Sequence, residues 1–179
     1  MQREVNSLKK GGVGILPTDT LYGIVASALN EKAVERVYAL KGRAPAKPCI
    51  ILISSLSDLA LFGVTLSPAL QTILSTYWPG PTSIILPCVG EAFAYLHRGT
   101  HSLAFRLPKN DSLRALLQET GPLIAPSANA EGLPPATTIK EAQDYFKDKV
   151  DFYMDGGVLN NPPSSLIRIS EDGAVEKLR

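Results

Sequence analysis

The chain has 179 residues, of which 45% are hydrophobic and 20% are charged, and its formal net charge is +1. This length suits one domain with a well-packed core, so we expect a single domain over residues 1–179. The near-neutral charge argues against a protein that coats nucleic acid with a uniformly basic surface, and any basic site must therefore be local.

The start of the chain, MQREVNSLKKGG, lacks the apolar stretch of a signal peptide. No apolar run reaches the length that a membrane span requires. We therefore expect a cytoplasmic protein that does not enter a membrane. The two cysteines, Cys49 and Cys88, lie far apart in the sequence and indicate neither a disulfide framework nor a zinc knuckle.

Apolar runs alternate with helical patterns along the chain. The apolar runs predict short strands at GILP (14–17), CIILI (49–53), TSIILP (82–87), SLAFRLP (102–108), PLIAP (122–126), DFYMD (151–155), SLIRIS (165–170) and AVEKL (174–178). Helices with polar N-caps are predicted over residues 30–42, 67–78, 110–121 and 138–146. This order predicts an α/β fold with one twisted open sheet, mixed or largely parallel, and flanking helices.

Ligands of such sheets bind outside the carboxyl ends of the strands, so polar residues that follow a strand are candidates for a site. Thr20 follows the first strand within PTDTLYG, and Ser127 and Asn129 follow PLIA within PSANAEGLPP. The segment GGVLNNPPSS, which contains Ser164, follows DFYMD. Each of these loops also suits an ordinary turn or a helix N-cap. Arg106 lies inside an apolar strand pattern, so its charge must be paired or must face a cleft.

The segment KGRAPAKP (41–48) carries Lys41, Arg43 and Lys47 with no acid among them, and its two prolines keep it extended. Lys41 alone could serve the C-terminus of the preceding helix. Three cations exceed that need and suit a polyphosphate, because arginine binds phosphate in a bidentate manner and lysine supplies a point charge. No GxxxxGK[ST] motif occurs, so nucleotide binding here would not use a P-loop.

No metal site is expected. His97 and His101 are four residues apart, but Gly99 and Thr100 interrupt any helix between them, and neither an acid nor a cysteine completes a ligand set.

These motifs together resemble the YrdC-like family of threonylcarbamoyl-AMP synthases, in its short, single-domain form. The family's hallmark is K-x-R, then Lys or Asn four residues later, then a distant S-x-N. The resemblance runs in the same order from about residue 8 to residue 179. It rests on PTDTLYG, KGRAPAKP, WPGPTSIIL, SLAFRLP, PSANAEGLPP and the DGG…SS tail.

The resemblance implies a YrdC-like fold and a nucleotidyltransferase that condenses L-threonine, bicarbonate or CO₂, and ATP into threonylcarbamoyl-AMP and pyrophosphate. Mg²⁺ would accompany ATP. The product would serve the threonylcarbamoyl modification of the tRNA adenosine next to the anticodon, through a downstream tRNA threonylcarbamoyl transferase machinery. Weak binding of tRNA itself is a further expectation.

By position in the motifs, the resemblance also implies roles for individual residues. Those expected to act on the phosphates in catalysis are Lys41, Arg43 and Lys47. Those expected to bind the nucleotide are Arg43, Lys47, Ser102, Ser127, Asn129 and Arg179. Those expected to bind threonine are Thr20, Arg106, Ala125 and Ser164.

The chain departs from the family pattern at several positions. Ala130-Glu131-Gly132 replaces a polar-Ser-Gly sequence after S-x-N, Leu52 stands where some members have a histidine, and Gly23-Ile24-Val25 replaces Gly-Leu-Gly. Two other functions are kept open. One is a non-catalytic module that binds RNA or tRNA on the same basic surface, and the other is a related carbamoyl-transfer domain.

Overall fold

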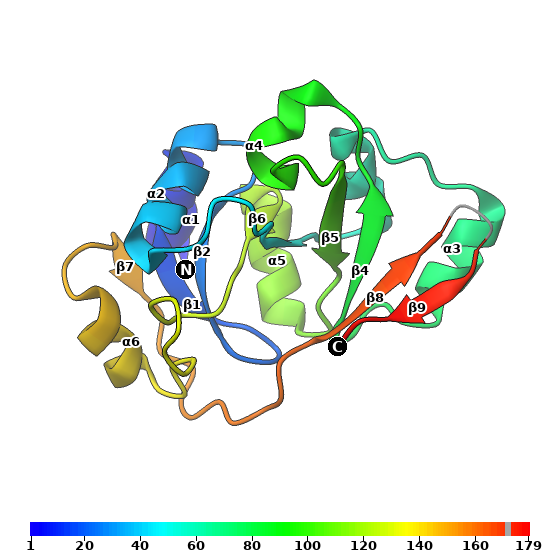
Figure 1. Cartoon of the computed structure of the whole chain (residues 1–179). Helices are drawn as coiled ribbons and strands as arrows, with labels where there is room; N and C mark the ends of the chain where they lie inside the picture. The colour runs from blue at the N-terminus through cyan, green and yellow to red at the C-terminus, as the bar shows by residue number, and fades with distance from the viewer. Residues whose placement is uncertain (171–172) are drawn as a thin grey trace.

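The computed structural model describes residues 1–170 and 173–179. Its central feature is a nine-stranded sheet with the order β7-β1-β2-β6-β3-β5-β4-β8-β9, which twists from one end of the molecule to the other (Figure 1). The strands are β1 (Gly14–Pro17), β2 (Tyr22–Ser27), β3 (Ile50–Leu52), β4 (Thr82–Pro87), β5 (Ser102–Arg106), β6 (Leu123–Ile124), β7 (Phe152–Tyr153), β8 (Ser165–Ile169) and β9 (Val175–Lys177).

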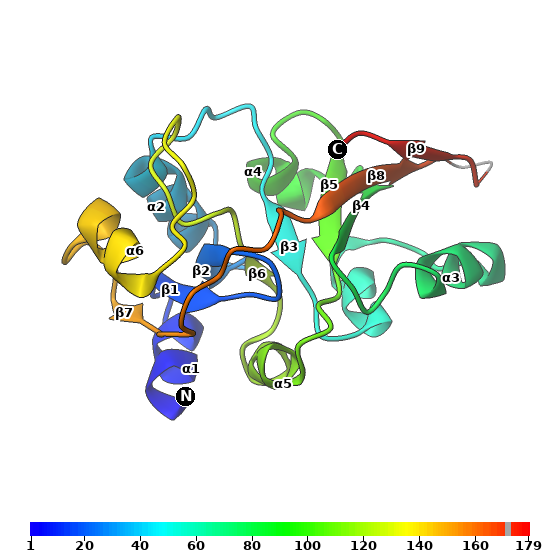
Figure 2. The same ribbon diagram turned by 90° about the horizontal axis from the view of Figure 1, so that it is seen from below.

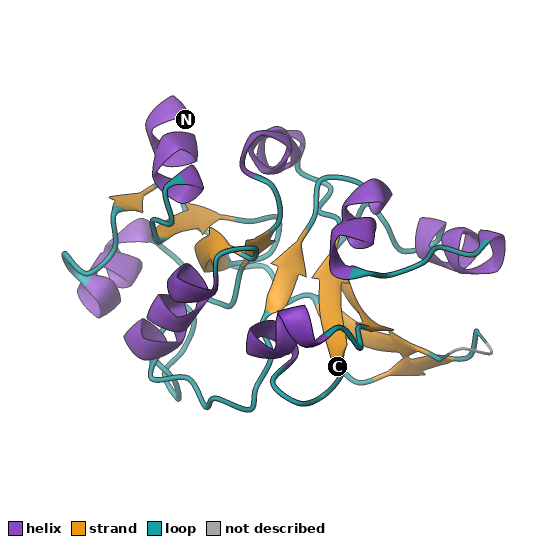
Figure 3. Ribbon diagram, turned by 90° about the horizontal axis from the view of Figure 1, so that it is seen from above, coloured by secondary structure: helices purple, strands orange, loops and turns teal. Residues whose placement is uncertain are grey.

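Helices flank this sheet on both sides. They are α1 (Gln2–Lys9), α2 (Glu31–Lys41), α3 (Pro68–Ser75), α4 (Ala94–His97), α5 (Asp111–Thr120) and α6 (Ile139–Phe146), with the 3₁₀ helices η1 (Leu56–Phe62) and η2 (Glu91–Phe93). Helices α1 and α5 lie on one side of the sheet, and α2, α4 and α6 lie on the other (Figures 2 and 3). Among the described residues, no helix has the length and apolar character needed to cross a bilayer.

The predicted α/β fold with a twisted, open, mixed sheet is confirmed. The sheet is not largely parallel, however, because only the pairs β1–β7, β3–β5 and β4–β8 run parallel and the other neighbouring strands are antiparallel. Strand β2, which the sequence analysis did not predict, accounts for two of the antiparallel pairs. It returns antiparallel to β1 as a hairpin, so residues 18–21 of PTDTLYG form the turn between two strands.

Local chemistry explains why the predicted helices begin and end where they do. The Asn30 side chain accepts a hydrogen bond from the backbone N–H of Ala33 at the start of α2, and Gly42 ends that helix with a left-handed φ of 62°. Such a φ disfavours residues with a Cβ. The Thr138 hydroxyl caps α6 as predicted, but the Glu141 carboxylate accepts from Thr137 rather than from Thr138.

Two hydrophobic clusters fix the two faces of the sheet. The larger cluster joins α2, α4 and α6 to residues such as Ile51, Phe105 and Ile84, and the smaller joins α1 and α5 to Leu52 and Val25. Adjacent strand residues such as Ile51 and Leu52 therefore belong to different clusters, as the two-residue period of a strand requires.

Gly14 provides a test of this packing, because a Cβ added there would lie 2.2 Å from Cζ of Phe152. We expect Gly14→Ala to lower the free energy of unfolding by about 1–3 kcal/mol, since the ring of Phe152 must leave its place in the smaller cluster. Urea unfolding would measure this change. Gly90→Ala is the matched control, because its Cβ would meet Phe93 at an ordinary 3.8 Å. Equal midpoints for the two variants would contradict this account of the β1–β7 contact.

Candidate active site

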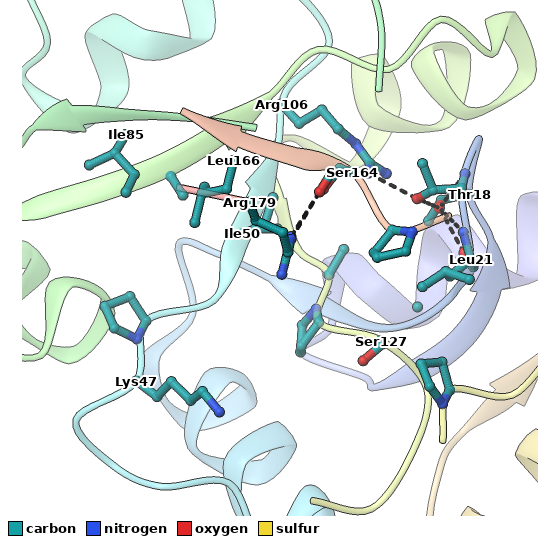
Figure 4. A pocket seen from close by; sticks show the side chains of 18 of the residues that line it. Thr18, Leu21, Lys47, Ile50, Ile85, Arg106, Ser127, Ser164, Leu166 and Arg179 are labelled. Atoms are coloured by element: carbon teal, nitrogen blue, oxygen red, sulfur yellow. Dashed lines mark hydrogen bonds between the residues drawn. The ribbon is translucent and has the colours of Figure 1, made fainter. Parts of the chain in front are cut away.

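A cavity of about 580 Å³ opens where strands from the middle of the sheet meet the loops that follow β1, α2 and β6 (Figure 4). Its floor is apolar. Ile50, Ala104 and Ile85 are register partners on the neighbouring strands β3, β5 and β4, so their side chains form a continuous row that lines the cavity. Leu166 extends this surface on β8. Such a floor can accept a flat apolar group such as a nucleobase.

The charged side chains that line the cavity are all cations. The cationic side chains that line the cavity are Arg43, Lys47, Arg106, Arg168 and Arg179. Among the described lining residues none is acidic, although the whole chain has a net charge of only +1. The cavity therefore concentrates positive charge, which favours an anionic ligand.

Backbone carbonyls hold Arg43 in the basic segment. Its Nε donates to the Lys47 carbonyl at 3.0 Å, and its Nη2 donates to the Pro48 carbonyl at 2.9 Å. Lys47 itself is different, because 62% of its side chain is exposed and its ammonium, within the described part of the chain, contacts Glu131 alone, at 3.0 Å. Arg43 is thus a fixed cation, whereas Lys47 is free to turn toward a ligand.

Lys41 is the one cation of the basic segment that does not line the cavity. It is 2% exposed, and its ammonium donates to the carbonyls of Ser127 and Asn129, both at 2.6 Å, and to Asn129 Oδ1 at 3.3 Å. Burial lowers its pKa to about 8, and the nearby Arg43 adds to this effect. The side chain is still an ammonium at neutral pH, and its three N–H groups match the three oxygens. The geometry does not favour the predicted contact of Lys41 with phosphates.

The loop after β6 depends on this ammonium. The Ser127 hydroxyl donates to Asn129 Oδ1 at 2.6 Å, and the Asn129 amide donates to the carbonyls of Ala130 and Leu133. Ser127 and Ala125 line the cavity, but Asn129 is buried behind them. The S-x-N motif therefore presents a serine to the cavity and uses the asparagine to shape the loop.

The turn between β1 and β2 brings a threonine to Arg106. Thr18 Oγ1 accepts from the backbone N–H groups of Thr20 and Leu21 and donates to the Leu21 carbonyl, which fixes the turn. Arg106 Nη1 then donates to Thr20 Oγ1 at 3.0 Å, and Arg106 Nη2 lies 2.9 Å from Asp19 Oδ1. Burial lowers the pKa of Arg106, and Asp19 opposes that shift. Among the described residues, the buried Nε of Arg106 has no hydrogen-bond partner.

The opposite wall comes from the end of the chain. Arg179 donates from Nε and Nη2 to the Ser164 carbonyl, at 3.1 and 3.0 Å, as Figure 4 shows. The Ser164 hydroxyl lies 3.0 Å from that of Ser83 on β4. The segment that leads to Ser164 is anchored further back, where the Tyr22 hydroxyl donates to the Gly157 carbonyl and accepts from Gly156 N–H.

The structure thus brings most of the predicted residues to one cavity. Those that line it are Thr20, Arg43, Lys47, Ser102, Arg106, Ala125, Ser127, Ser164 and Arg179. Lys41 and Asn129 lie behind it. Sequence reasoning missed Arg168, whose only signal was a charge within the strand pattern SLIRIS, and Thr100, which lies in a loop without a pattern.

Comparison with known proteins agrees with this geometry. The Sua5/YciO/YrdC family model, described as "Telomere recombination", matches residues 6–179. The chain belongs to this family.

Relatives within the family include two proteins named threonylcarbamoyl-AMP synthase. The one from Pyrococcus abyssi is 31% identical over 84% of this chain and 44% of its own length. The one from Marinobacter nauticus is 34% identical over 89% of this chain and 85% of its own length. The chain therefore spans less than half of the Pyrococcus relative but most of the Marinobacter one.

A family structure, that of P. abyssi Sua5 complexed with L-threonine, superposes on this chain with a TM-score of 0.87 at 29% identity. The match covers 99% of this chain and 53% of that one. The resemblance of folds thus extends over the whole described sheet and the cavity that it carries.

The burial of Lys41 predicts a large effect on stability. We expect Lys41→Met to lower the free energy of unfolding by about 2–4 kcal/mol, because three oxygens lose the ammonium that satisfies them. Urea unfolding would measure the loss. Lys140→Met, which removes an exposed lysine paired with Asp144 on α6, is the control and should change stability by no more than about 0.5 kcal/mol. Similar stabilities for the two variants would rule out the tethering role of Lys41.

Proposed function

We propose that this chain is a threonylcarbamoyl-AMP synthase. The threonine nitrogen bonds to the carbon of CO₂ and loses a proton, which gives a carbamate; starting from bicarbonate, the same bond forms with loss of water. A carbamate oxygen then attacks the α-phosphorus of ATP, the bond to the bridging oxygen breaks, and pyrophosphate leaves. The family membership and the names of relatives at 31% and 34% identity support this activity.

The observation that carries the proposal is the surplus of cations in a cavity whose described lining residues include no acid. The reaction joins two anions, the carbamate and the triphosphate, and expels a third. Positioning and charge neutralisation supply most of the catalysis in such phosphoryl chemistry, and no side-chain base is needed for the attack. A cavity with arginines, a lysine and hydroxyl groups suits that demand.

We assign the nucleotide to the side of the cavity near the basic segment. Arg43 and the mobile Lys47 would bind the β- and γ-phosphates, together with Arg179 from the opposite wall. The hydroxyls of Ser102 and Ser127 would contact the nucleoside, which can rest on the apolar row of the floor. Lys41 and Asn129 act through the loop that they hold, so they are positioning residues rather than groups that touch ATP.

We assign threonine to the region around Arg106. Arg106 lines the cavity, and a guanidinium holds a carboxylate through charge-assisted hydrogen bonds. Thr20 holds one end of the same guanidinium, and Ser164 and Ala125 line the adjacent wall. The site would thus hold threonine with its amine toward the phosphates.

Mg²⁺ would enter with ATP as part of the substrate. Among the described residues, no group of three or more His, Cys, Asp or Glu side chains could hold a metal ion, so the phosphates and water would supply most of its ligands. The product would be consumed by an enzyme that transfers the threonylcarbamoyl group to tRNA, and the basic rim of the cavity could contact that tRNA weakly.

The first test is pyrophosphate release by the purified chain with ATP and Mg²⁺. We expect release that requires both threonine and bicarbonate, because ATP meets its nucleophile only after the carbamate forms. Omitting each co-substrate in turn is the control. Binding of tRNA with a steep salt dependence and without pyrophosphate release would instead favour the non-catalytic RNA-binding module.

Lys47→Met tests the phosphate assignment. We expect a decrease in kcat/KM for ATP of about tenfold to a hundredfold, since the variant loses one cation that faces the developing charge. Stability should stay within about 0.5 kcal/mol of the wild type, because the Lys47 ammonium makes one exposed ion pair. Steady-state kinetics measures kcat/KM for ATP, and urea unfolding measures the free energy of unfolding. Lys140→Met is the control for both measurements. Unchanged kcat/KM would remove Lys47 from the site.

A further inference from the structure

Glu131 brings a negative charge to the mouth of the cationic cavity. It follows Asn129 in the loop after β6, at the position where the chain departs from the family pattern. Its Oε1 lies 3.0 Å from Lys47 Nζ, and its Oε2 lies 3.9 Å from Arg43 Nη1. Its backbone N–H donates to the Lys41 carbonyl at 2.8 Å, so the loop and the basic segment are joined at both the backbone and the side chain.

Glu131 lies next to the nitrogen atoms of the basic segment that other protein groups do not engage, Arg43 Nη1 and Lys47 Nζ. Arg43 Nε and Nη2 are engaged by the carbonyls of Lys47 and Pro48, and the ammonium of Lys41 is engaged by three oxygens. Arg43 Nη1 and Lys47 Nζ remain, and both face the Glu131 carboxylate. A polyphosphate that uses these two groups competes with the carboxylate for their positive charge.

The Glu131 carboxylate is ionised at neutral pH. Lys47, then Arg43 and Lys41, hold the pKa of Glu131 below its usual value. A single negative charge is a weak rival for a triphosphate, which carries several. Since 35% of the Glu131 side chain is exposed, its contact with Lys47 is of the kind that water and ions loosen readily.

We infer that Glu131 is an internal competitor for the polyphosphate subsite, which occupies Lys47 and Arg43 when no ligand is bound and returns to them when pyrophosphate leaves. This inference rests on the proposed function and names a residue that sets affinity within the same site. Ligands with β- and γ-phosphates compete with Glu131 for the two cations, and ligands without these phosphates do not.

The consequence is a selective effect on different ligands. Removing the carboxylate strengthens the binding of ATP and of pyrophosphate by a similar factor, while AMP binds as before. In the wild type, the return of Glu131 therefore assists the departure of pyrophosphate after the reaction.

Glu131→Gln tests this inference, because it keeps the size of the side chain and removes its charge. Isothermal titration of the whole chain with MgATP, inorganic pyrophosphate and AMP gives the three dissociation constants. We expect those for MgATP and pyrophosphate to fall about two- to fivefold, the range expected for an exposed ion pair, and that for AMP to stay constant. Asp144→Asn, which removes one charge from an exposed ion pair on α6, is the matched control and should change none of the three.

Repeating the Glu131→Gln substitution in a Lys47→Met chain separates competition for Lys47 from a general effect of charge on ligand binding. In a Lys47→Met chain, Glu131→Gln should change the pyrophosphate constant by less than it does in the wild type, because the main partner of the carboxylate is gone. Equal affinities for pyrophosphate in the wild type and Glu131→Gln would overturn this inference. The proposed function would still stand. Equal tightening of AMP and pyrophosphate would overturn it as well. Failure of the wild type to bind either MgATP or pyrophosphate would refute both this inference and the proposed function.

Discussion

The site depends on one buried ammonium group. Lys41 comes from the last turn of α2. The oxygens that accept its three hydrogen bonds come from the loop after β6, 86 and 88 residues further along the chain. A charge at 2% exposure is tolerated only with such partners, so the helix end and the loop are held at one separation. Ser127, Arg43 and Glu131 all occupy the two segments that this contact joins. The geometry of the cavity mouth therefore follows from an interaction that lies behind it.

Two of the five cations that line the cavity are held by backbone carbonyls. Arg43 is bound to two carbonyls and Arg179 to one, while Arg106 has Asp19 beside it, outside the cavity lining. Fixed cations of this kind do not need to reorganise when anions arrive, which is what electrostatic catalysis requires. Lys47 differs, because its exposed ammonium contacts the Glu131 carboxylate. The proposed phosphate subsite therefore combines fixed cations with one exposed ion pair.

Most of the fold and much of the site could be predicted from the sequence, for identifiable reasons. Strands such as 82–87 stood out as apolar runs, and the cap at Asn30 and the stop at Gly42 marked α2 clearly. The β2 strand was missed because its start, Tyr22-Gly23, belongs to PTDTLYG, whose polar residues were interpreted as a loop after the first strand. The direction of the Lys41 side chain could not be predicted, because it depends on where a loop some 86 residues away places its carbonyls. The pairing of Glu131 with Lys47 has the same long-range origin.

The anchoring of the segment before β8 constrains the chain in a further way. The Tyr22 hydroxyl forms hydrogen bonds with the backbone of Gly156 and Gly157 at one end of this segment. The contact between the Ser83 and Ser164 hydroxyls holds the other end. A Cβ on Gly156 would lie 2.4 Å from Pro17 Cβ, so this anchor has no room for a larger residue. The segment between Gly157 and Ser164 is held at both ends, and each residue extends it by about 3.3 Å at most. We therefore expect this segment to tolerate substitutions better than insertions or deletions. A change in its length would move Ser164 away from the cavity wall that it completes.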